Sequence, residues 1–528
     1  MKETFKKIAL ADTAIISLFY SLAFGIMLLN PGIFLDDWFV YSMNKEDLIK
    51  LAIQAGKPLS GYFWVLLLAF KNLLLCRLAV FFSFLFSGLL LNGILKNIKE
   101  IDKGERLLIV LISTLYPVNF FRLSLGTADY AFCNFLFFFG FWMLTRYLKT
   151  RSLYYRIGSL AMFFCSFFTH SLLCFYAVVL LYLLYAQHVA ALTNKERLNV
   201  IGRFLDFAVL PGIFWCLKLT LLKQSGIYEN YNKLSLGLIP HLPLPLLTSF
   251  YYNIYAVLDY SLKIFSHNYT GILLLSIAIF FMLSAKQDIA VKADRRDLRF
   301  FLLGILVFLC GLFPYLLLGY TPLLGDYQSR HQLLVPLGAG FILFYGCKIF
   351  FARLGLGRQK QVFCYSFITA LFVVVNFFAY LDFQRDWFKQ LAIVEEFRSS
   401  EVIKGHTTFL FDDRTAGLNA HSRVYRYYEY NALFNYALGD ETRFGENLDP
   451  FRGMPWYQTY IKDPTYLFRD YKPKEPEYKV IITPGAYTLE KFPELMRLWY
   501  RSYFDRETYR KSLLKVLRFE YVKLAPRQ

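Results

Sequence analysis

The chain has 528 residues, of which 56% are hydrophobic, and its mean hydropathy is +0.38. Soluble globular domains are usually about 45–50% apolar, so this composition argues against a soluble protein. A net charge of +19 would suggest a nucleic-acid partner if the protein were soluble. Here the Lys and Arg residues gather in short loops between apolar blocks, which is typical of a membrane protein, and we expect no nucleic-acid partner.

Apolar blocks of about 15–25 residues fill the chain before residue 382, which is the length needed to cross a bilayer core about 30 Å thick. The N-terminus is basic and then apolar, with no obvious small-residue cleavage site, so we interpret it as a retained first span. The stretch 157–187 is too long for one crossing and is divided at Thr169-His170. The sequence therefore predicts about eleven spans, at 8–29, 74–95, 107–121, 128–145, 157–169, 171–187, 204–222, 271–284, 300–318, 332–351 and 361–381.

The loops between these blocks alternate in charge, and every second loop is basic, beginning with Lys2, Lys6 and Lys7 at the N-terminus. Because Lys and Arg accumulate in the cytoplasmic loops of membrane proteins, these loops are expected in the cytoplasm. An odd number of spans then places residues 382–528 outside. We therefore expect a multi-pass protein of the cell inner (cytoplasmic) membrane, with a cytoplasmic N-terminus and a periplasmic or extracellular C-terminal region. Membrane lipids are expected among its partners.

The first outward segment carries two adjacent carboxylates, Asp36 and Asp37, directly after the first span. Two adjacent carboxylates destabilise each other's ionised form, so their presence together suggests a function. One function is general-base catalysis, in which one carboxylate accepts a proton and the other orients the substrate or holds a cation. The structural alternative is that Asp37 caps a helix over Phe39–Ile53. Further along, Gly56-Lys57-Pro58 is either a plain loop or a turn back to the membrane, where Lys57 meets an anionic headgroup or phosphate.

The short outward turn between the third and fourth spans contains Arg122 and Asp129. Charges this close to the membrane often mark functional sites. Alternatively, the Arg122 side chain only extends so that its charged group lies at the membrane–water interface. His170 lies in the turn between two apolar helices, and we interpret it as structural.

A third outward segment, residues 319–338, places Asp326, Arg330 and His331 just outside the tenth span. The planar fork of an Arg side chain matches phosphate oxygens, and His can add a further donor. A lipid-linked phosphate would arrive at this depth, whereas the alternative is that these residues only anchor the helix at the interface.

Residues 382–528 are rich in charge, Pro and Tyr and contain no apolar run long enough to span a membrane. The segments 406–414, 478–485 and 516–524 predict strands flanked by turns, and the segments 428–438 and 494–504 predict helices. We therefore divide the chain into a multi-span domain, 1–381, and a small α/β extracytoplasmic domain, 382–528. Charged and aromatic side chains between residues 414 and 429 suit carbohydrate binding, but we interpret them as a helix face packed on the membrane domain.

The sequence resembles membrane glycosyltransferases of the GT-C superfamily, and within it the bacterial serotype-converting O-antigen glucosyltransferases of the Gtr type. The resemblance rests on Leu-Asp-Asp-Trp at 35–38, Gly-Lys-Pro-Leu at 56–59, the many-span layout and the outward C-terminal domain. Lys57 stands where the family pattern leads us to expect Arg. The fold class is accordingly a polytopic α-helical membrane protein with a small α/β domain.

The resemblance implies that a sugar passes from a polyprenyl-phosphate donor to an outward-facing envelope glycan or lipid-linked acceptor, such as a lipopolysaccharide O-antigen. The catalytic acid of the family then corresponds to Asp36 or Asp37. Arg330 is the best candidate for binding the donor phosphate, with His331, Lys57 and Arg122 as further candidates, and Asp129 and Asp326 are candidates for the acceptor. No cofactor is implied with certainty. Two acids can hold a divalent metal, but no wider acid cluster completes a cage.

Two other function classes stay open. A transporter or flippase would use intramembrane charges, broken helices and repeated halves, yet the predicted spans contain few ionisable residues and no repeat is visible. A non-catalytic membrane protein for envelope assembly would use its outer domain to bind partners.

Overall fold

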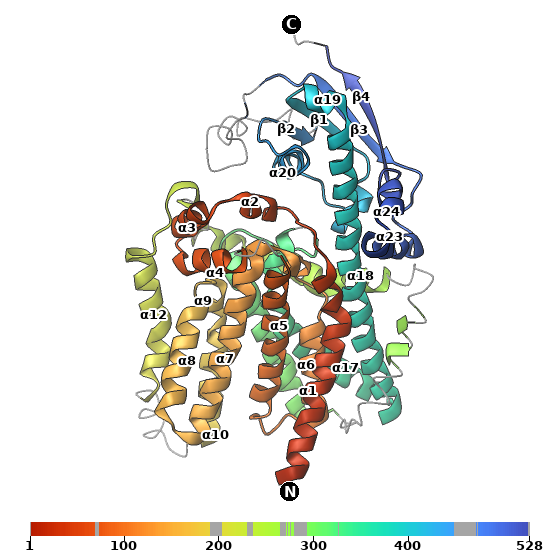
Figure 1. Ribbon diagram of the computed structural model, residues 1–528. Helices are drawn as coiled ribbons and strands as arrows, with labels where there is room; N and C mark the ends of the chain where they lie inside the picture. Colours follow the sequence, from red (N-terminus) through yellow and green to blue (C-terminus); the bar gives the residue numbers. More distant parts are fainter. Residues whose placement is uncertain are drawn as a thin grey trace.

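The computed structural model describes residues 2–68, 73–190, 203–229, 236–263, 271, 273–274, 276–278, 293–325, 327–447, 471 and 474–525. These residues form a helical bundle and, beyond one end of it, a small sheet with its own helices (Figure 1). The N-terminus lies at the end of the bundle that is far from the sheet, whereas the C-terminus lies beyond the sheet (Figure 1).

Six helical segments are long and apolar enough to cross a membrane, which confirms six of the predicted spans. They are formed by α1 (Lys2–Phe24) with η1 (Gly25–Leu29), α5 (Leu73–Leu95), α7 (Ala128–Thr150), α16 (Arg295–Leu316), α17 (Val335–Arg353) and α18 (Arg358–Ser399).

Four further predicted spans correspond to shorter helices of 13 to 16 residues: α6 (Lys103–Leu115), α8 (Leu153–Ser166), α10 (Ala177–Ala190) and α12 (Leu205–Thr220). The interruption after α8, followed by α9 (Ser171–Phe175), confirms the division at Thr169-His170. The predicted span 271–284 lies largely outside the described residues. The described chain therefore has the helices of a membrane protein, and the count of about eleven spans stays a prediction.

Helix α6 lies in the interior of the bundle although it is short. Its side chains from Leu107 to Ile112 are at most 4% exposed because α1, α5, α17 and α18 pack around it. A capping box formed by Asp102 and Glu105 begins the helix. The helix ends at Leu115, before the predicted end at residue 121, because Pro117 disfavours a helical conformation at the residue that precedes it.

The chain between η1 and α5 forms three short helices at the end of the bundle nearest the sheet (Figure 1): α2 (Asp37–Ser42), α3 (Lys45–Gln54) and α4 (Pro58–Leu68). The turn η3 (Leu125–Thr127) contacts α2, and η2 (Phe120–Leu123) contacts η8 (Tyr327–Gln332). The other short helical segments of the bundle are η4 (Gly226–Tyr228), η5 (Leu236–His241), α13 (Pro243–Phe250), the π-helical turn η6 (Tyr251–Tyr255) and α14 (Ala256–Lys263).

Helix α18 carries the chain from the bundle to the sheet (Figure 1). It has 42 residues and contains no Gly or Pro that would end it. At 1.5 Å per residue it is roughly 63 Å long, about twice the thickness of a bilayer core. It therefore continues well beyond the predicted end at residue 381, and residue 382 lies inside a continuous helix.

The sheet has the strand order β2-β1-β3-β4. Strand β1 (Thr408–Asp413) is parallel to β2 (Phe444–Asn447) and to β3 (Tyr478–Pro484), and β4 (Leu517–Lys523) is antiparallel to β3. Three of these strands confirm the predicted ones. The sequence does not predict β2, because Phe-Gly-Glu-Asn is short and lacks the β-branched residues typical of strands. The helices of this region are α19 (Glu401–Gly405), α20 (Tyr427–Leu438), α23 (Phe492–Phe504) and α24 (Arg506–Leu513), with short turns η9 (Ala416–Leu418) and η10 (Ala420–Ser422).

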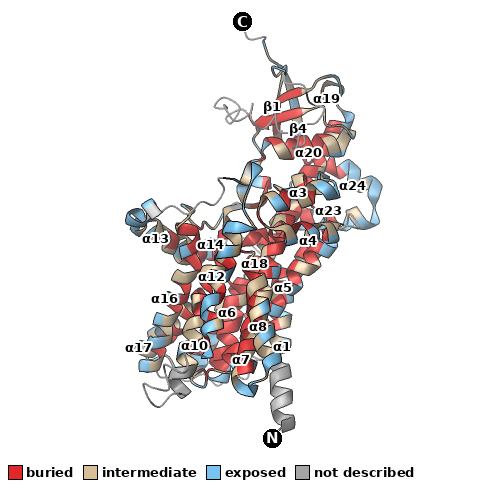
Figure 2. Ribbon diagram, turned by 90° about the vertical axis from the view of Figure 1, so that its left-hand side faces the viewer, coloured by how far each residue is buried: buried red, intermediate tan, exposed pale blue. Residues whose placement is uncertain are grey.

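The bundle and the sheet share one hydrophobic core, which continues along α18 (Figure 2). Helix α20, which confirms a predicted helix, packs between α18 and the sheet. Phe397 of α18 stacks on Phe434 with ring centroids 4.3 Å apart, and Phe411 of β1 stacks on Tyr430 at 4.0 Å. The C-terminal region is thus packed firmly on the end of the bundle where α2 to α4 lie.

Candidate functional site

The two adjacent carboxylates lie at the start of α2 and have different surroundings. Asp37 is 2% exposed. Its Oδ1 accepts hydrogen bonds from Ser124 Oγ at 2.7 Å and from the Gly126 backbone N–H at 3.2 Å. Burial raises the pKa of Asp37 from 3.8 to about 7, which exceeds the opposing effect of these hydrogen bonds and places its titration near neutral pH.

The structure contradicts the prediction that Asp37 caps one helix over Phe39–Ile53. Two helices, α2 and α3, occupy this segment, and Asn44 caps the second by accepting a hydrogen bond from the Asp47 N–H at 2.8 Å. The Asp37 side chain instead reaches across to the turn between η2 and η3.

Asp36 occupies the N-cap position of α2 but makes no side-chain capping hydrogen bond, and it is half-buried. It is therefore the more accessible of the two carboxylates. Asp37 links the first outward segment to the second, whereas Asp36 stays partly exposed.

A second link joins the same two segments. Lys57 precedes the first residue of α4, and its Nζ lies 3.5 Å from Asp129 Oδ2 at the start of α7 and 4.5 Å from the centre of the Tyr130 ring. Ser60 Oγ donates a hydrogen bond of 3.1 Å to the same carboxylate oxygen. Burial alone would lower the pKa of Lys57, but Tyr130 and the Asp129 carboxylate raise it above its ordinary value, so the ammonium group stays charged.

The turn before Lys57 requires a glycine at position 56. Its φ is +70°, and a Cβ there would lie 2.5 Å from the backbone oxygen of Leu222, which follows α12. In addition, the Ser225 N–H donates a hydrogen bond of 2.9 Å to the Gln54 carbonyl. The end of α12 is therefore held against the first outward segment, close to Lys57.

Further basic side chains come from α12 and from η8. Lys218 Nζ lies 3.4 Å from His170 Nδ1, and Arg330 Nε lies 3.4 Å from His331 Nε2. Burial lowers the pKa of His170 well below its usual value, and the charges of Lys218 and Lys57 lower it further. Burial and the charge of Arg330 lower the pKa of His331 to about 3. Both imidazoles are therefore neutral at neutral pH.

The positive charges of Lys57 and Arg330 lie within electrostatic range of one hydroxyl, that of Tyr315 in α16. The Tyr315 ring also packs against that of His331 in a tilted arrangement, with ring centroids 5.0 Å apart. Arg330 and His331 of η8 thus lie beside α16, and the charge of Lys57 acts on the same end of that helix. Lys218 and Tyr315 join them, and sequence reasoning assigned neither to the site because each lies in an apolar helix with no motif around it.

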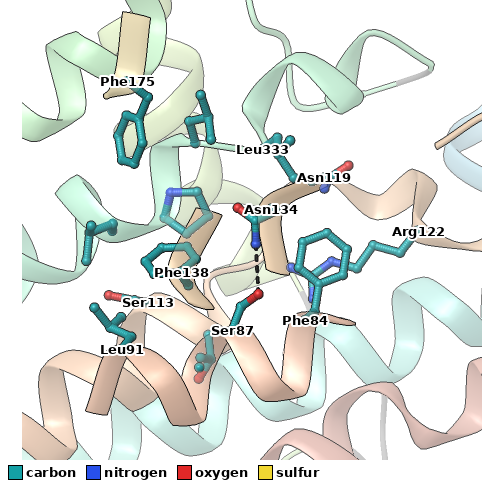
Figure 3. A pocket seen from close by; sticks show the side chains of 15 residues that line it. Phe84, Ser87, Leu91, Ser113, Asn119, Arg122, Asn134, Phe138, Phe175 and Leu333 are labelled. Atoms are coloured by element: carbon teal, nitrogen blue, oxygen red, sulfur yellow. Dashed lines mark hydrogen bonds between the residues drawn. The ribbon is translucent and has the colours of Figure 1, made fainter. Parts of the chain in front are cut away.

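Arg122 has a different environment from these residues. It is 4% exposed, and its guanidinium carbon lies 4.3 Å from the centre of the Phe24 ring and 4.4 Å from that of Phe84. It lines a cavity of about 60 Å³ together with the polar residues Ser87, Ser113, Thr114, Asn119 and Asn134, and the remaining lining is apolar (Figure 3). This volume has room for a few water molecules.

The structure thus brings Asp37, Asp129, Lys57 and, through α2, Asp36 to one place, whereas Asp326 lies outside the described residues. Among the residues that the structure describes, no three His, Cys, Asp or Glu side chains gather as metal ligands would. The chemistry available at this site is proton transfer by a carboxylate next to fixed positive charges that can hold an anion.

No protein-family model and no curated protein sequence matches this chain.

Proposed function

We propose that this protein is a membrane glycosyltransferase, which moves a sugar from a polyprenyl-phosphate donor to an outward-facing envelope glycan or lipid-linked acceptor. The observation that carries the proposal is the meeting of two outward segments that are far apart in sequence. Asp37 bonds to Ser124 and Gly126, and Lys57 and Ser60 contact Asp129. A carboxylate pair and the half-buried ammonium group of Lys57 are thereby held together at one end of the bundle.

In the proposed reaction Asp36 accepts the proton of the acceptor hydroxyl while the hydroxyl oxygen attacks the anomeric carbon of the donor sugar. The bond between the anomeric carbon and the phosphate oxygen breaks, and the lipid phosphate leaves with the electron pair. Lys57 and Arg330 stabilise the negative charge of the phosphate. Asp37 holds Asp36 in place through its own hydrogen bonds to Ser124 and Gly126. Alternatively, Asp37 binds a cation at the site.

The test is sugar transfer from a purified polyprenyl-phosphate donor by the full-length protein in vesicles. Asp36→Asn keeps the size of the side chain but removes its basicity, so we expect the rate to fall by about 10²–10⁴. Expression and membrane insertion should not change. Glu46→Gln is a matched control, because Glu46 is an exposed acid in the same outward segment, on α3.

The role of Asp37 is tested in the same assay. Asp37→Asn retains an acceptor for Ser124, so a large loss of rate would indicate that its charge is needed as well as its hydrogen bonds. If Asp36→Asn and Asp37→Asn both transfer sugar at the wild-type rate, the proposal is wrong, and a transport or assembly role becomes the better explanation.

A further inference from the structure

Each residue that flanks the carboxylate pair donates a hydrogen bond to the C-terminal region. The Leu35 backbone N–H donates to Glu429 Oε1 at 3.3 Å, and the indole N–H of Trp38 donates to Gln390 Oε1 at 3.1 Å. Glu429 belongs to α20, and Gln390 belongs to the part of α18 that lies beyond its apolar segment. Asp36 and Asp37 are thus bracketed by contacts to residues about 350 to 390 positions later in the chain.

These two acceptors belong to one buried network. Arg423 donates to Glu429 and, through Nε at 3.1 Å, to Asp386. Asp386 also accepts a hydrogen bond of 3.1 Å from Gln390 Nε2. The side chains of Arg423, Asp386 and Glu429 are at most 1% exposed. The contacts run from Leu35 to Glu429, then through Arg423, Asp386 and Gln390 to Trp38. They therefore connect the two residues on either side of the carboxylate pair.

The backbone at the centre of this network is strained. Leu35 has a φ of +54°, although it is not a glycine. A left-handed conformation is unfavourable for an L-residue other than glycine, and it persists only where the surrounding contacts enforce it. The Glu429 carboxylate supplies one such contact. A second comes from Arg77 of α5, which donates to the Gly32 carbonyl three residues earlier.

We propose that Glu429, held by Arg423 and Asp386, is a positioning residue that fixes the turn carrying Asp36 and Asp37 from the C-terminal region. This inference rests on the proposed function, since it assigns the C-terminal region a part in the reaction. A buried charge network that only joined the bundle to the C-terminal region would also stabilise the fold. It would not need to fix the backbone conformation of Leu35.

Hydrogen exchange of the full-length protein measures the turn directly, without reference to activity. Glu429→Met removes the carboxylate and keeps an unbranched side chain, so exchange in the peptide spanning Leu35–Trp38 should rise about 3–10-fold. Glu429→Gln retains an acceptor oxygen and should give an intermediate rise. Trp38→Phe removes the N–H that Gln390 accepts, together with one ring of the indole, and should loosen the same peptide. Trp499→Phe is the matched control, because Trp499 is buried in α23 away from this turn.

Sugar transfer by the same variants gives the second measurement. A misplaced base lowers the chemical rate without weakening the donor site, so we expect kcat to fall about 10–100-fold with KM for the donor unchanged. If a variant is only less stable, its kcat per folded molecule and its KM for the donor should both stay at the wild-type values. If Glu429→Met does not fold, Trp38→Phe carries both measurements, because it leaves every charge of the network in place.

The outcomes separate the inference from the proposed function. Unchanged exchange of the Leu35–Trp38 peptide in Glu429→Met and in Trp38→Phe overturns the inference, even if the enzyme is active. Faster exchange with an unchanged kcat overturns it as well. A wild-type protein that transfers no sugar refutes the proposed function, whereas the exchange result still decides whether Glu429 holds the turn.

Discussion

Asp36 and Asp37 are neighbours in the chain, yet the fold gives them different chemistry. The first turn of α2 directs Asp37 into the protein, where it meets Ser124 and Gly126, and leaves Asp36 half-buried at the helix start. A carboxylate in a buried environment loses the water that stabilises its charge, and its pKa rises. The pair therefore combines a partly exposed carboxylate with a second, buried acid that titrates near neutral pH.

This difference predicts a pH dependence of stability that belongs to Asp37. Its pKa is about 7 in the folded protein, against an ordinary value of 3.8 in the unfolded chain. Between these values the unfolded chain binds fewer protons at this group, so the free energy of unfolding falls as the pH rises from about 4 to about 7. Asp37→Asn does not titrate. The unfolding midpoint of the wild type relative to Asp37→Asn should therefore fall across this window and stay constant above it.

The same comparison with Glu46→Gln serves as the control, because the Glu46 side chain is exposed in the folded protein as it is in the unfolded chain. A constant difference between wild type and Asp37→Asn from pH 4 to pH 7 would mean that Asp37 is ionised throughout, and that its hydrogen bonds outweigh its burial.

At the scale of the helices, buried charges join three elements at the end of the bundle opposite the candidate site. Lys348 of α17 is fully buried, and its Nζ lies 2.6 Å from Glu105 of α6 and 2.8 Å from Asp297 of α16. Arg296 approaches the same Glu105 at 3.2 Å. Removing one partner of a buried ion pair leaves the others uncompensated, which is more costly than losing a surface pair.

Lys348→Met should therefore lower the free energy of unfolding by about 3–5 kcal/mol, measured by denaturant unfolding in mixed micelles. The control is Lys404→Met, which breaks the exposed pair between Lys404 and Glu401 on α19 and should cost less than about 1 kcal/mol. Equal losses in the two variants would show that the three helices do not depend on this network.

At the scale of the whole molecule, the segments predicted to share a side of the membrane lie together. Lys103 and Arg106 approach Asp12 of α1, and Arg296 approaches Glu105, so the loops before α6 and α16 meet at the N-terminal end of the bundle. The first and second outward segments meet at the other end, below the sheet (Figure 1). This arrangement fits the alternation of basic and less basic loops along the chain.

Which end faces the cytoplasm stays a prediction, with a cytoplasmic N-terminus and an outward C-terminal region. Alkaline phosphatase is active only outside the cytoplasm, so a fusion after Gln528 should be active and a fusion within residues 146–156 should be inactive. Equal expression of the two fusions, checked by immunoblot, is the control. An inactive fusion at Gln528 would place the C-terminal region in the cytoplasm and would remove the outward acceptor from the proposal.

The sequence by itself determines the properties that depend on neighbouring residues. Runs of apolar residues identify α1, α5, α7, α16 and α17, because crossing a bilayer requires about 20 such residues in succession. Alternating patterns bounded by turn residues identify β1, β3 and β4. The position of Asp36 and Asp37 after the first span likewise follows from the order of residues alone.

Only the tertiary structure decides properties that depend on contacts between distant segments. Asp37 is buried because the turn at Ser124 covers it. The charges of Lys57 and Lys218 of α12 both act on His170. The Leu35 N–H donates a hydrogen bond to Glu429. No local pattern encodes these pairs, because each depends on how whole helices pack against one another. The physical reason is that burial and proximity set the pKa of a carboxylate and the energy of a charge, and both are properties of the assembled fold.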